Sequence, residues 1–147
     1  MPFPHFIFVT GAGVDKNILM LTSYNCKSFG DDKLNIIRKL VDDSTFVLLQ
    51  EHWQYEKQFI EKVNCNFPNV NCIVSSPMDE NVPRIGRGKG GIAILWKDNF
   101  KGMIKKINCI SKRLCAIEVI LENFKFIILN VYMPTDPGSG NHDIPDF

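Results

Sequence analysis

The amino-acid sequence predicts a mixed α/β domain, and three observations carry this prediction. The 147-residue chain is 45% hydrophobic and 11% aromatic, which is typical of a single packed globular domain. Within the first fifty residues, two apolar runs of strand length flank a helical pattern. After residue 90 the chain consists of short apolar runs, one of which alternates with polar residues, and this indicates antiparallel strands.

The first half of the chain alternates strands and helices. Ser28 and Asp31 supply helix-start chemistry, because a hydroxyl accepts from a free N–H and an acid suits the positive helix end. Leu34, Ile37 and Val41 then repeat at helical spacing. The expected strand, helix, strand, helix and strand lie at 18–24, 31–42, 45–50, about 54–64 and 69–75. This order favours a sheet with helices packed on it.

The second half of the chain is predicted to be β throughout, after a polar loop at 77–90. That loop holds two prolines and three glycines, and a loop of this length in a compact domain is typical of a functional segment. Four strands are expected at 91–96, about 103–109, 114–121 and 124–133. Residues 122–123 (Glu-Asn) fit a two-residue hairpin turn, because Asn tolerates a positive φ angle.

The α/β domain is expected to span residues 18–136, with a short segment on each side. Residues 1–17 are predicted to be either a leader or a short extra strand, and residues 137–147 a loop-like tail rich in Gly and Pro. No segment resembles a signal peptide or a membrane span, so no membrane partner is expected. The five cysteines are odd in number and lack a Cys-x-x-Cys spacing, which predicts neither disulfides nor zinc. These features predict an intracellular protein, either nuclear or cytoplasmic.

Charge is distributed unevenly along the chain. Residues 84–113 hold nine Lys or Arg and one acidic residue, a local balance of +8, whereas residues 1–83 carry a balance of −3. A basic half favours a polyanionic partner such as nucleic acid. A solvated basic face without a partner is the alternative that charge alone leaves open.

Three polar residues each end an apolar run of strand length. Glu51 follows 45–50, and the carboxyl ends of strands are where open α/β sheets bind ligands. Its carboxylate suits Mg²⁺, which needs few protein ligands because it keeps waters and takes phosphate oxygens. Asn25 and Tyr132 end the runs at 18–24 and 124–133. Each of the three could also have only a structural role: Glu51 could begin the next helix, Asn25 could form a turn, and Tyr132 could be an ordinary strand residue. Together, however, the three side chains can converge on one edge of the domain.

Four segments carry a resemblance to a known family. They are 24–26 (Tyr-Asn-Cys), 48–53 (Leu-Leu-Gln-Glu-His-Trp), 86–96 and 130–136. Their order and spacing resemble the endonuclease/exonuclease/phosphatase superfamily, and most closely the endonuclease domains of non-long-terminal-repeat retrotransposons. The Gly-Gly-Ile-Ala-Ile-Leu-Trp stretch at 90–96 weighs most in that choice. The resemblance covers about residues 18–136.

This resemblance implies a fold, an activity and a cofactor. The fold would be the first half of a four-layer α/β sandwich, and the activity a hydrolysis of DNA phosphodiesters that depends on Mg²⁺, with Mn²⁺ as a substitute. Glu51 would be the metal ligand, Asn25 would shape the metal and phosphate site, and Tyr132 would contact the scissile phosphate. In a full-length element the domain would be fused to a reverse transcriptase.

The resemblance also suggests how DNA would be held. Arg84, Arg87 and Lys89 would bind the phosphate backbone, which positions a duplex without reading its sequence. Thr135 would bond a phosphate at a position where relatives often have Asn. Lys27 stands where many relatives carry an acid, so a second carboxylate is absent there.

The family's later motifs have no counterpart before Phe147. These motifs are an Asp-x-Asn that positions the attacking water and a terminal Asp-His pair, and His142-Asp143 is in the wrong order to match. We therefore expect no complete hydrolytic site in these residues, and an exposed inner face of the sheet. Two alternatives stay open: a phosphoesterase acting on RNA, inositol phosphates or lipid head groups, or a non-enzymatic retroelement relic that at most binds nucleic acid.

Overall fold

The structure is a computed structural model, and it describes residues 5–9, 19–100, 102–122 and 125–133. Thr135, the tail at 137–147 and Asn123 of the expected hairpin turn lie outside these residues. Of the two alternatives for residues 1–17, the structure shows the short extra strand, at His5–Val9.

The first sheet has five strands in the order β1-β2-β3-β5-β4. Its strands are β1 (His5–Val9), β2 (Leu19–Asn25), β3 (Phe46–Gln50), β4 (Val70–Ser75) and β5 (Ile92–Lys97). Strands β2 and β3 are parallel, and every other neighbouring pair is antiparallel. The β2–β3 pair needs a crossover, which a helix supplies.

The second sheet has three antiparallel strands in the order β6-β7-β8. They are β6 (Ile104–Ile107), β7 (Leu114–Ile120) and β8 (Lys125–Val131). The mixed first sheet and the antiparallel second sheet confirm the predicted α/β class.

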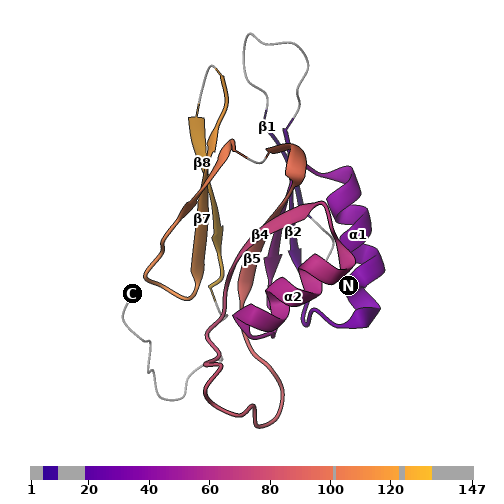
Figure 1. Ribbon diagram of the computed structural model, residues 1–147, viewed down its shortest axis with the longest axis vertical. Helices are drawn as coiled ribbons and strands as arrows, with labels where there is room; N and C mark the ends of the chain where they lie inside the picture. Colours follow the sequence, from indigo (N-terminus) through magenta and orange to yellow (C-terminus); the bar gives the residue numbers. More distant parts are fainter. Residues whose placement is uncertain (1–4, 10–18, 101, 123–124, 134–147) are drawn as a thin grey trace.

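Two helices cover one face of the first sheet, and the second sheet covers the other. The helices are α1 (Leu34–Asp43), preceded by the 3₁₀ turn η1 (Asp31–Lys33), and α2 (Glu56–Asn66). Figure 1 shows the three layers side by side, with the helices on the right and β7 and β8 on the left. A further 3₁₀ turn, η2 (Asp98–Phe100), follows β5. Neither helix in the described part of the chain has the length and apolar content to span a membrane.

The central strands are buried on both faces, which explains why their sequences are continuously apolar. In β5, Ala93 and Leu95 belong to the core under the helices, whereas Ile92, Ile94 and Trp96 belong to the core between the sheets. Each of these five side chains is at most 5% exposed. Alternating residues thus supply two separate cores, as expected for a strand between two apolar layers.

The expected exposure of an inner sheet face is wrong, because the two sheets pack against each other through their inner faces. The outer face of the second sheet is exposed instead. It presents large apolar side chains at Ile120, Ile127, Leu129, Val131 and Met133. Strand alternation directs these side chains away from the core that Ile128 and Val119 enter.

The first helical segment begins at Asp31 as predicted, but the predicted capping by Ser28 is wrong. Gly30 occupies the N-cap position of η1, and no side chain caps that turn or α1. Ser28 lies in the left-handed region at φ 104°, and its N–H donates to the Glu51 carbonyl at 2.8 Å. The reason is tertiary, because the segment after β2 pairs with the segment after β3 instead of capping a helix. All five cysteines are free thiols, in agreement with their spacing.

Candidate active site

Three segments of backbone meet at the carboxyl ends of β2 and β3. Beyond the strand ends, Cys26 N–H donates to the Gln50 carbonyl at 3.0 Å, and Trp53 N–H donates to the Gly90 carbonyl at 3.0 Å. The loop after β3 is therefore held between the loop after β2 and the segment that leads into β5. This pairing fixes the backbone at Glu51 on both sides.

The backbone of this region holds four non-glycine residues at positive φ. They are Lys27 at 43°, Ser28 at 104°, Glu51 at 55° and Trp53 at 54°. Side chains disfavour this region, where a left-handed residue costs about 1–2 kcal/mol. Such residues persist where the surrounding structure over-determines them, and they cluster at functional sites.

The Glu51 carboxylate is held by two side chains, one at the end of β2 and one just after β8. Asn25 Nδ2 donates to Glu51 Oε1 at 3.0 Å, and the Tyr132 hydroxyl donates to the same oxygen at 2.8 Å. Asn25 Oδ1 accepts from the Lys27 N–H at 3.2 Å, which orients the amide with its nitrogen toward Glu51. The structure thus brings together the three residues that the sequence singled out.

A buried polar network behind Glu51 joins the two sheets, and the sequence reasoning did not identify it. Asn130 of β8 is 2% exposed, and its Nδ2 donates to the carbonyls of Leu49 at 2.9 Å and Ala93 at 2.8 Å. Gln50 Nε2 donates to Asn130 Oδ1 at 2.8 Å. Strand alternation could have identified Asn130 from the sequence. Asn130 and Tyr132 are two residues apart, so their side chains lie on the same face of the sheet.

His52 follows Glu51 but is fully buried and has a structural role. Its Nδ1 accepts from the Gln54 N–H at 3.1 Å, so Nε2 carries the proton and donates to the Ser75 carbonyl at 3.2 Å. Burial lowers the pKa of His52 from 6.5 to about 4, so the ring is neutral at pH 7. A Cβ at Gly91 would overlap this ring, which explains the need for glycine there. Both ring nitrogens are therefore occupied within the protein.

Basic side chains surround the Glu51 end of the domain. Arg84, Arg87 and Lys89 are exposed on the loop before β5, and the Arg87 guanidinium lies 4.0 Å from the centre of the Trp53 ring. On the second sheet, the Arg113 carbonyl accepts from the Tyr132 N–H at 3.0 Å, so the loop before β7 is beside the site. The sequence reasoning counted Arg113 in the basic half but did not assign it to the site.

Tyr132 is adapted to act as a hydrogen-bond donor. Partial burial and the hydrogen bond to Glu51 raise the pKa of its hydroxyl above the ordinary value of 10.0. The hydroxyl therefore keeps its proton throughout the neutral range. Tyr132 can donate to Glu51 or to a nearby anion, and it cannot serve as a general base near pH 7.

The side chains near Glu51 could supply one metal ligand, but they do not form a complete set of ligands. In the described part of the chain, no group of three or more His, Cys, Asp or Glu side chains is placed to hold a metal. Both hydrogen bonds to the Glu51 carboxylate in that part of the chain go to Oε1, and Oε2 accepts none there. One carboxylate oxygen is compatible with Mg²⁺, which takes its remaining ligands from water and phosphate. Because Asn25 directs its amide nitrogen to Glu51, we assign it to orienting Glu51, and its expected role as a metal ligand stays a prediction.

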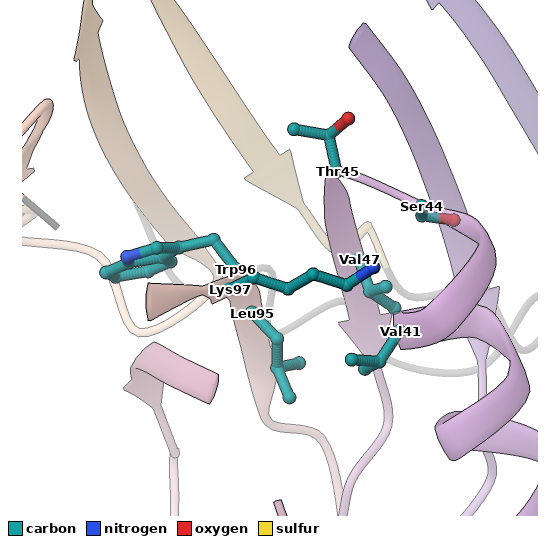
Figure 2. Close-up of a pocket in the computed structure, with 7 residues that line it drawn as sticks. All are labelled: Val41, Ser44, Thr45, Val47, Leu95, Trp96 and Lys97. Atoms are coloured by element: carbon teal, nitrogen blue, oxygen red, sulfur yellow. The ribbon is translucent and has the colours of Figure 1, made fainter. Parts of the chain in front are cut away.

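A shallow surface depression lies at the opposite ends of the same strands. Figure 2 shows its lining, which includes Thr45 and Val47 at the start of β3 and Lys97 at the end of β5. The Lys97 ammonium donates to the Asp42 carbonyl at 2.8 Å. The depression is separate from Glu51, since β3 lies between the two, and its lining holds no acidic side chain.

No family model matches this chain. The curated proteins also include no match to it.

Proposed function

We propose that this chain supplies the Glu51-bearing half of a metal-dependent phosphodiesterase domain that hydrolyses DNA. The proposed family is the endonuclease/exonuclease/phosphatase superfamily, and within it the endonuclease type of non-long-terminal-repeat retrotransposons. One observation carries the proposal: Asn25, Glu51 and Tyr132, which stand at the ends of three strands, meet at one carboxylate oxygen.

The layers of the fold support the same proposal. Two helices, a mixed sheet and an antiparallel sheet form three layers, and the sheets pack face to face. The apolar outer face of the second sheet, at Ile127, Leu129 and Val131, is suited to a fourth layer of helices. We therefore propose a four-layer sandwich as the complete architecture.

Each of the three residues has a distinct task in this proposal. Glu51 binds Mg²⁺ through Oε2, while Asn25 and Tyr132 hold Oε1 so that the carboxylate cannot rotate. A bound Mg²⁺ supplies charge that neutralises the phosphate and stabilises the leaving oxyanion. When substrate binds, the Tyr132 hydroxyl exchanges its hydrogen bond to Glu51 for one to a phosphate oxygen. Thr135, beyond the described residues, is proposed to add a second hydroxyl near the same phosphate.

The charge around the site supports nucleic acid as the substrate class. Arg84, Arg87 and Lys89 on one loop and Arg113 on another lie at the Glu51 end. Lys112, next to Arg113, is ion-paired with Glu56 at 3.0 Å. Cations on both sides of a phosphodiester site match a strand of phosphates, and they give an affinity that falls with salt. This favours DNA over an isolated phosphoester such as an inositol phosphate.

Metal binding can be tested without requiring turnover. Mn²⁺ titrated into the ¹⁵N-labelled chain should broaden the amide resonances of residues around Glu51 and those of Tyr132. Glu51→Gln should abolish this broadening, since it removes the anionic ligand and keeps the size and hydrogen bonding of the side chain. Glu61→Gln, at an exposed position on α2, is the matched control and should leave the broadening unchanged.

A nicking assay on supercoiled plasmid with Mg²⁺ tests the reaction. Residues 1–147 contain no match to the family's later motifs, so we expect salt-dependent DNA binding with weak or no nicking. Nicking that Glu51→Ala abolishes would show that the chain is an active nuclease. A chain that binds neither Mn²⁺ nor DNA would contradict the proposal, and Glu51-dependent hydrolysis of an inositol phosphate or of sphingomyelin would replace DNA with that substrate.

A further inference from the structure

The two edges of the second sheet differ in composition. Within the described residues, this sheet ends at β6 on one side and at β8 on the other. β6 has four residues, of which Lys105 and Lys106 are exposed lysines. β8 has seven residues, and its only charged one is Lys125, at the first position. Short edge strands and edge lysines oppose pairing with another chain, whereas a long apolar edge favours it. β6 is therefore protected against strand pairing, and β8 is not.

The backbone of β8 presents hydrogen-bonding groups away from β7 at alternate residues. The Tyr132 N–H donates to the Arg113 carbonyl at 3.0 Å, which extends the β7–β8 register by one pair. Because hydrogen-bonded pairs alternate in an antiparallel ladder, the even-numbered residues of β8 bond to β7. The N–H and carbonyl groups of Ile127, Leu129 and Val131 therefore point away from β7. These three residues form the β8 edge.

The β8 edge also carries half-exposed apolar side chains. Ile127 is 57% exposed, Leu129 is 53% exposed and Val131 is 50% exposed. Strand alternation places them on the outer face of the sheet, opposite Ile128, which belongs to the core between the sheets. In strand addition, backbone hydrogen bonds supply affinity and alternate side chains supply specificity. The β8 edge offers both kinds of contact at the same residues.

The β8 edge is complementary to itself. When two β8 strands pair antiparallel about a two-fold axis at Leu129, this residue lies opposite its own copy, and Ile127 lies opposite Val131 of the second copy. These pairs fall at hydrogen-bonding positions, because all three residues point toward the edge. Lys125 lies opposite Met133 of the second copy, so no like charges face each other. A second copy therefore matches the edge in hydrogen bonding, apolar character and charge.

We propose that a second copy of this chain pairs with β8, antiparallel about a two-fold axis at Leu129, and joins the two second sheets into one. This inference goes beyond the proposed function. The pairing uses the β8 edge of both copies, and the lysine-bearing β6 strands form the outer margins of the joined sheet. Assembly therefore stops at a closed dimer and does not continue into a fibre.

The surface available along β8 predicts a weak dimer. A specific interface needs about 1,000 Å² of buried surface in total. The half-exposed side chains and the strand backbone offer at most about 500 Å² per copy, which places the pair at this lower limit. We therefore expect reversible dimerisation between micromolar and millimolar concentration, and not a permanent complex.

Sedimentation velocity of the whole chain, in buffer without divalent metal, measures the association. Leu129→Lys should weaken the dimer by about tenfold, because it places two like charges opposite each other at the axis. Leu129→Glu should weaken it to a similar extent. An equimolar mixture of the two variants should restore the dimer, since opposite charges then meet. This recovery requires Leu129 to lie next to its own copy.

Ile120→Lys is the matched control for the charge substitutions. Ile120 is 45% exposed on the outer face of the same sheet, but it belongs to β7 and not to the open edge. The substitution should leave the dimer unchanged. If Ile120→Lys weakens the association as much as Leu129→Lys does, the copies stack through their outer faces, and the strand-pairing inference is overturned.

A proline at the axis tests the role of the backbone. Leu129→Pro removes an N–H that points toward the edge, and by the register it removes no hydrogen bond to β7. It should weaken the dimer, whereas Leu129→Val, which keeps the N–H and the apolar character, should not. Equal association of these two variants would overturn strand pairing. Thermal melts of each variant confirm that the fold is retained.

The remaining outcomes are also decisive. A chain that stays monomeric up to millimolar concentration would overturn the inference, and so would a Lys/Glu mixture that does not recover, because the axis at Leu129 would then be wrong. The Tyr132 side chain lies on the opposite face of the sheet from Leu129, and no measurement here depends on metal or DNA. A dimer found together with no Mn²⁺ binding at Glu51 would contradict the proposed function alone.

Discussion

The Tyr132 hydroxyl donates to Glu51 Oε1 at 2.8 Å, and this bond joins the end of β8 in one sheet to the end of β3 in the other. Asn25, at the end of β2, donates to the same oxygen. The side chains at three strand ends therefore meet at a single carboxylate oxygen. The orientation of the Glu51 carboxylate therefore depends on both sheets.

Tyr132→Phe should weaken Mn²⁺ binding by about tenfold, since residues that orient a metal ligand typically contribute 10- to 100-fold to affinity. The free energy of unfolding should change by only about 1 kcal/mol, because one partly exposed hydrogen bond is lost. Paramagnetic broadening measures the affinity, and a urea melt measures the stability. An unchanged Mn²⁺ affinity would show that Tyr132 does not orient the ligand.

The Glu51 carboxylate contributes to the raised pKa of Tyr132, so Glu51→Gln should lower that pKa toward 10.0. The raised value has a consequence for stability. The folded state favours the protonated phenol, so this contribution is complete below pH 10 and is lost as the pH rises through the folded pKa. Absorbance at 295 nm follows tyrosinate formation, and Tyr132→Phe identifies which transition belongs to Tyr132. A pKa that is the same with and without the charge at Glu51 would contradict the hydrogen-bond assignment.

His52 should make the fold acid-sensitive. Its pKa is lowered by burial from 6.5 to about 4, so the unfolded chain binds the proton more readily. The stabilising contribution is complete above pH 6.5 and is lost as the pH falls toward 4, with an amplitude on the order of 3 kcal/mol. An NMR titration of the imidazole proton signals gives the pKa. A His52 signal that titrates near 6.5 in the folded protein would contradict the burial argument.

Gly91→Ala should be far more destabilising than Gly102→Ala. Both glycines have φ near +90°, at 88° and 89°, so both substitutions incur the same backbone strain of about 1–2 kcal/mol. At Gly102 nothing lies within 4 Å of the added Cβ, whereas at Gly91 the Cβ would overlap the His52 ring. Overpacking should add about 1–3 kcal/mol, which chemical denaturation can resolve. Equal effects of the two substitutions would mean that the His52 ring can move away.

Asn130→Asp should destabilise the fold at the junction of the two sheets. The amide nitrogen donates to two buried carbonyls, and a carboxylate would place an unpaired charge against both of them. We expect a loss of at least about 3 kcal/mol in the free energy of unfolding, whereas Asn69→Asp at an exposed position should change it by about 0.5 kcal/mol or less. Isothermal denaturation of both variants at pH 7 is the measurement. A small effect at Asn130 would indicate that water replaces its hydrogen bonds.

Local patterns were sufficient to predict both helices and the strands from β2 to β8 in the described residues. The helical spacing of Leu34, Ile37 and Val41 places an amphipathic helix correctly because periodicity is a property of neighbouring residues. The continuous apolar run at Phe46–Gln50 likewise indicates a strand covered on both faces. The position of Glu51 at a strand end was also visible in the sequence. The predicted capping role of Ser28 was wrong, since its backbone pairs with a segment more than twenty residues away.

The sequence by itself determined which residues stand at the ends of strands, because that depends on short runs of apolar side chains. Only the tertiary structure decided that these ends meet. Tyr132 is 81 residues from Glu51 along the chain, and their contact requires the order of strands in one sheet and the packing of a second sheet against it. The neutral ring of His52 and the exposure of Ile85 are decided in the same way, since burial is set by residues distant in the sequence.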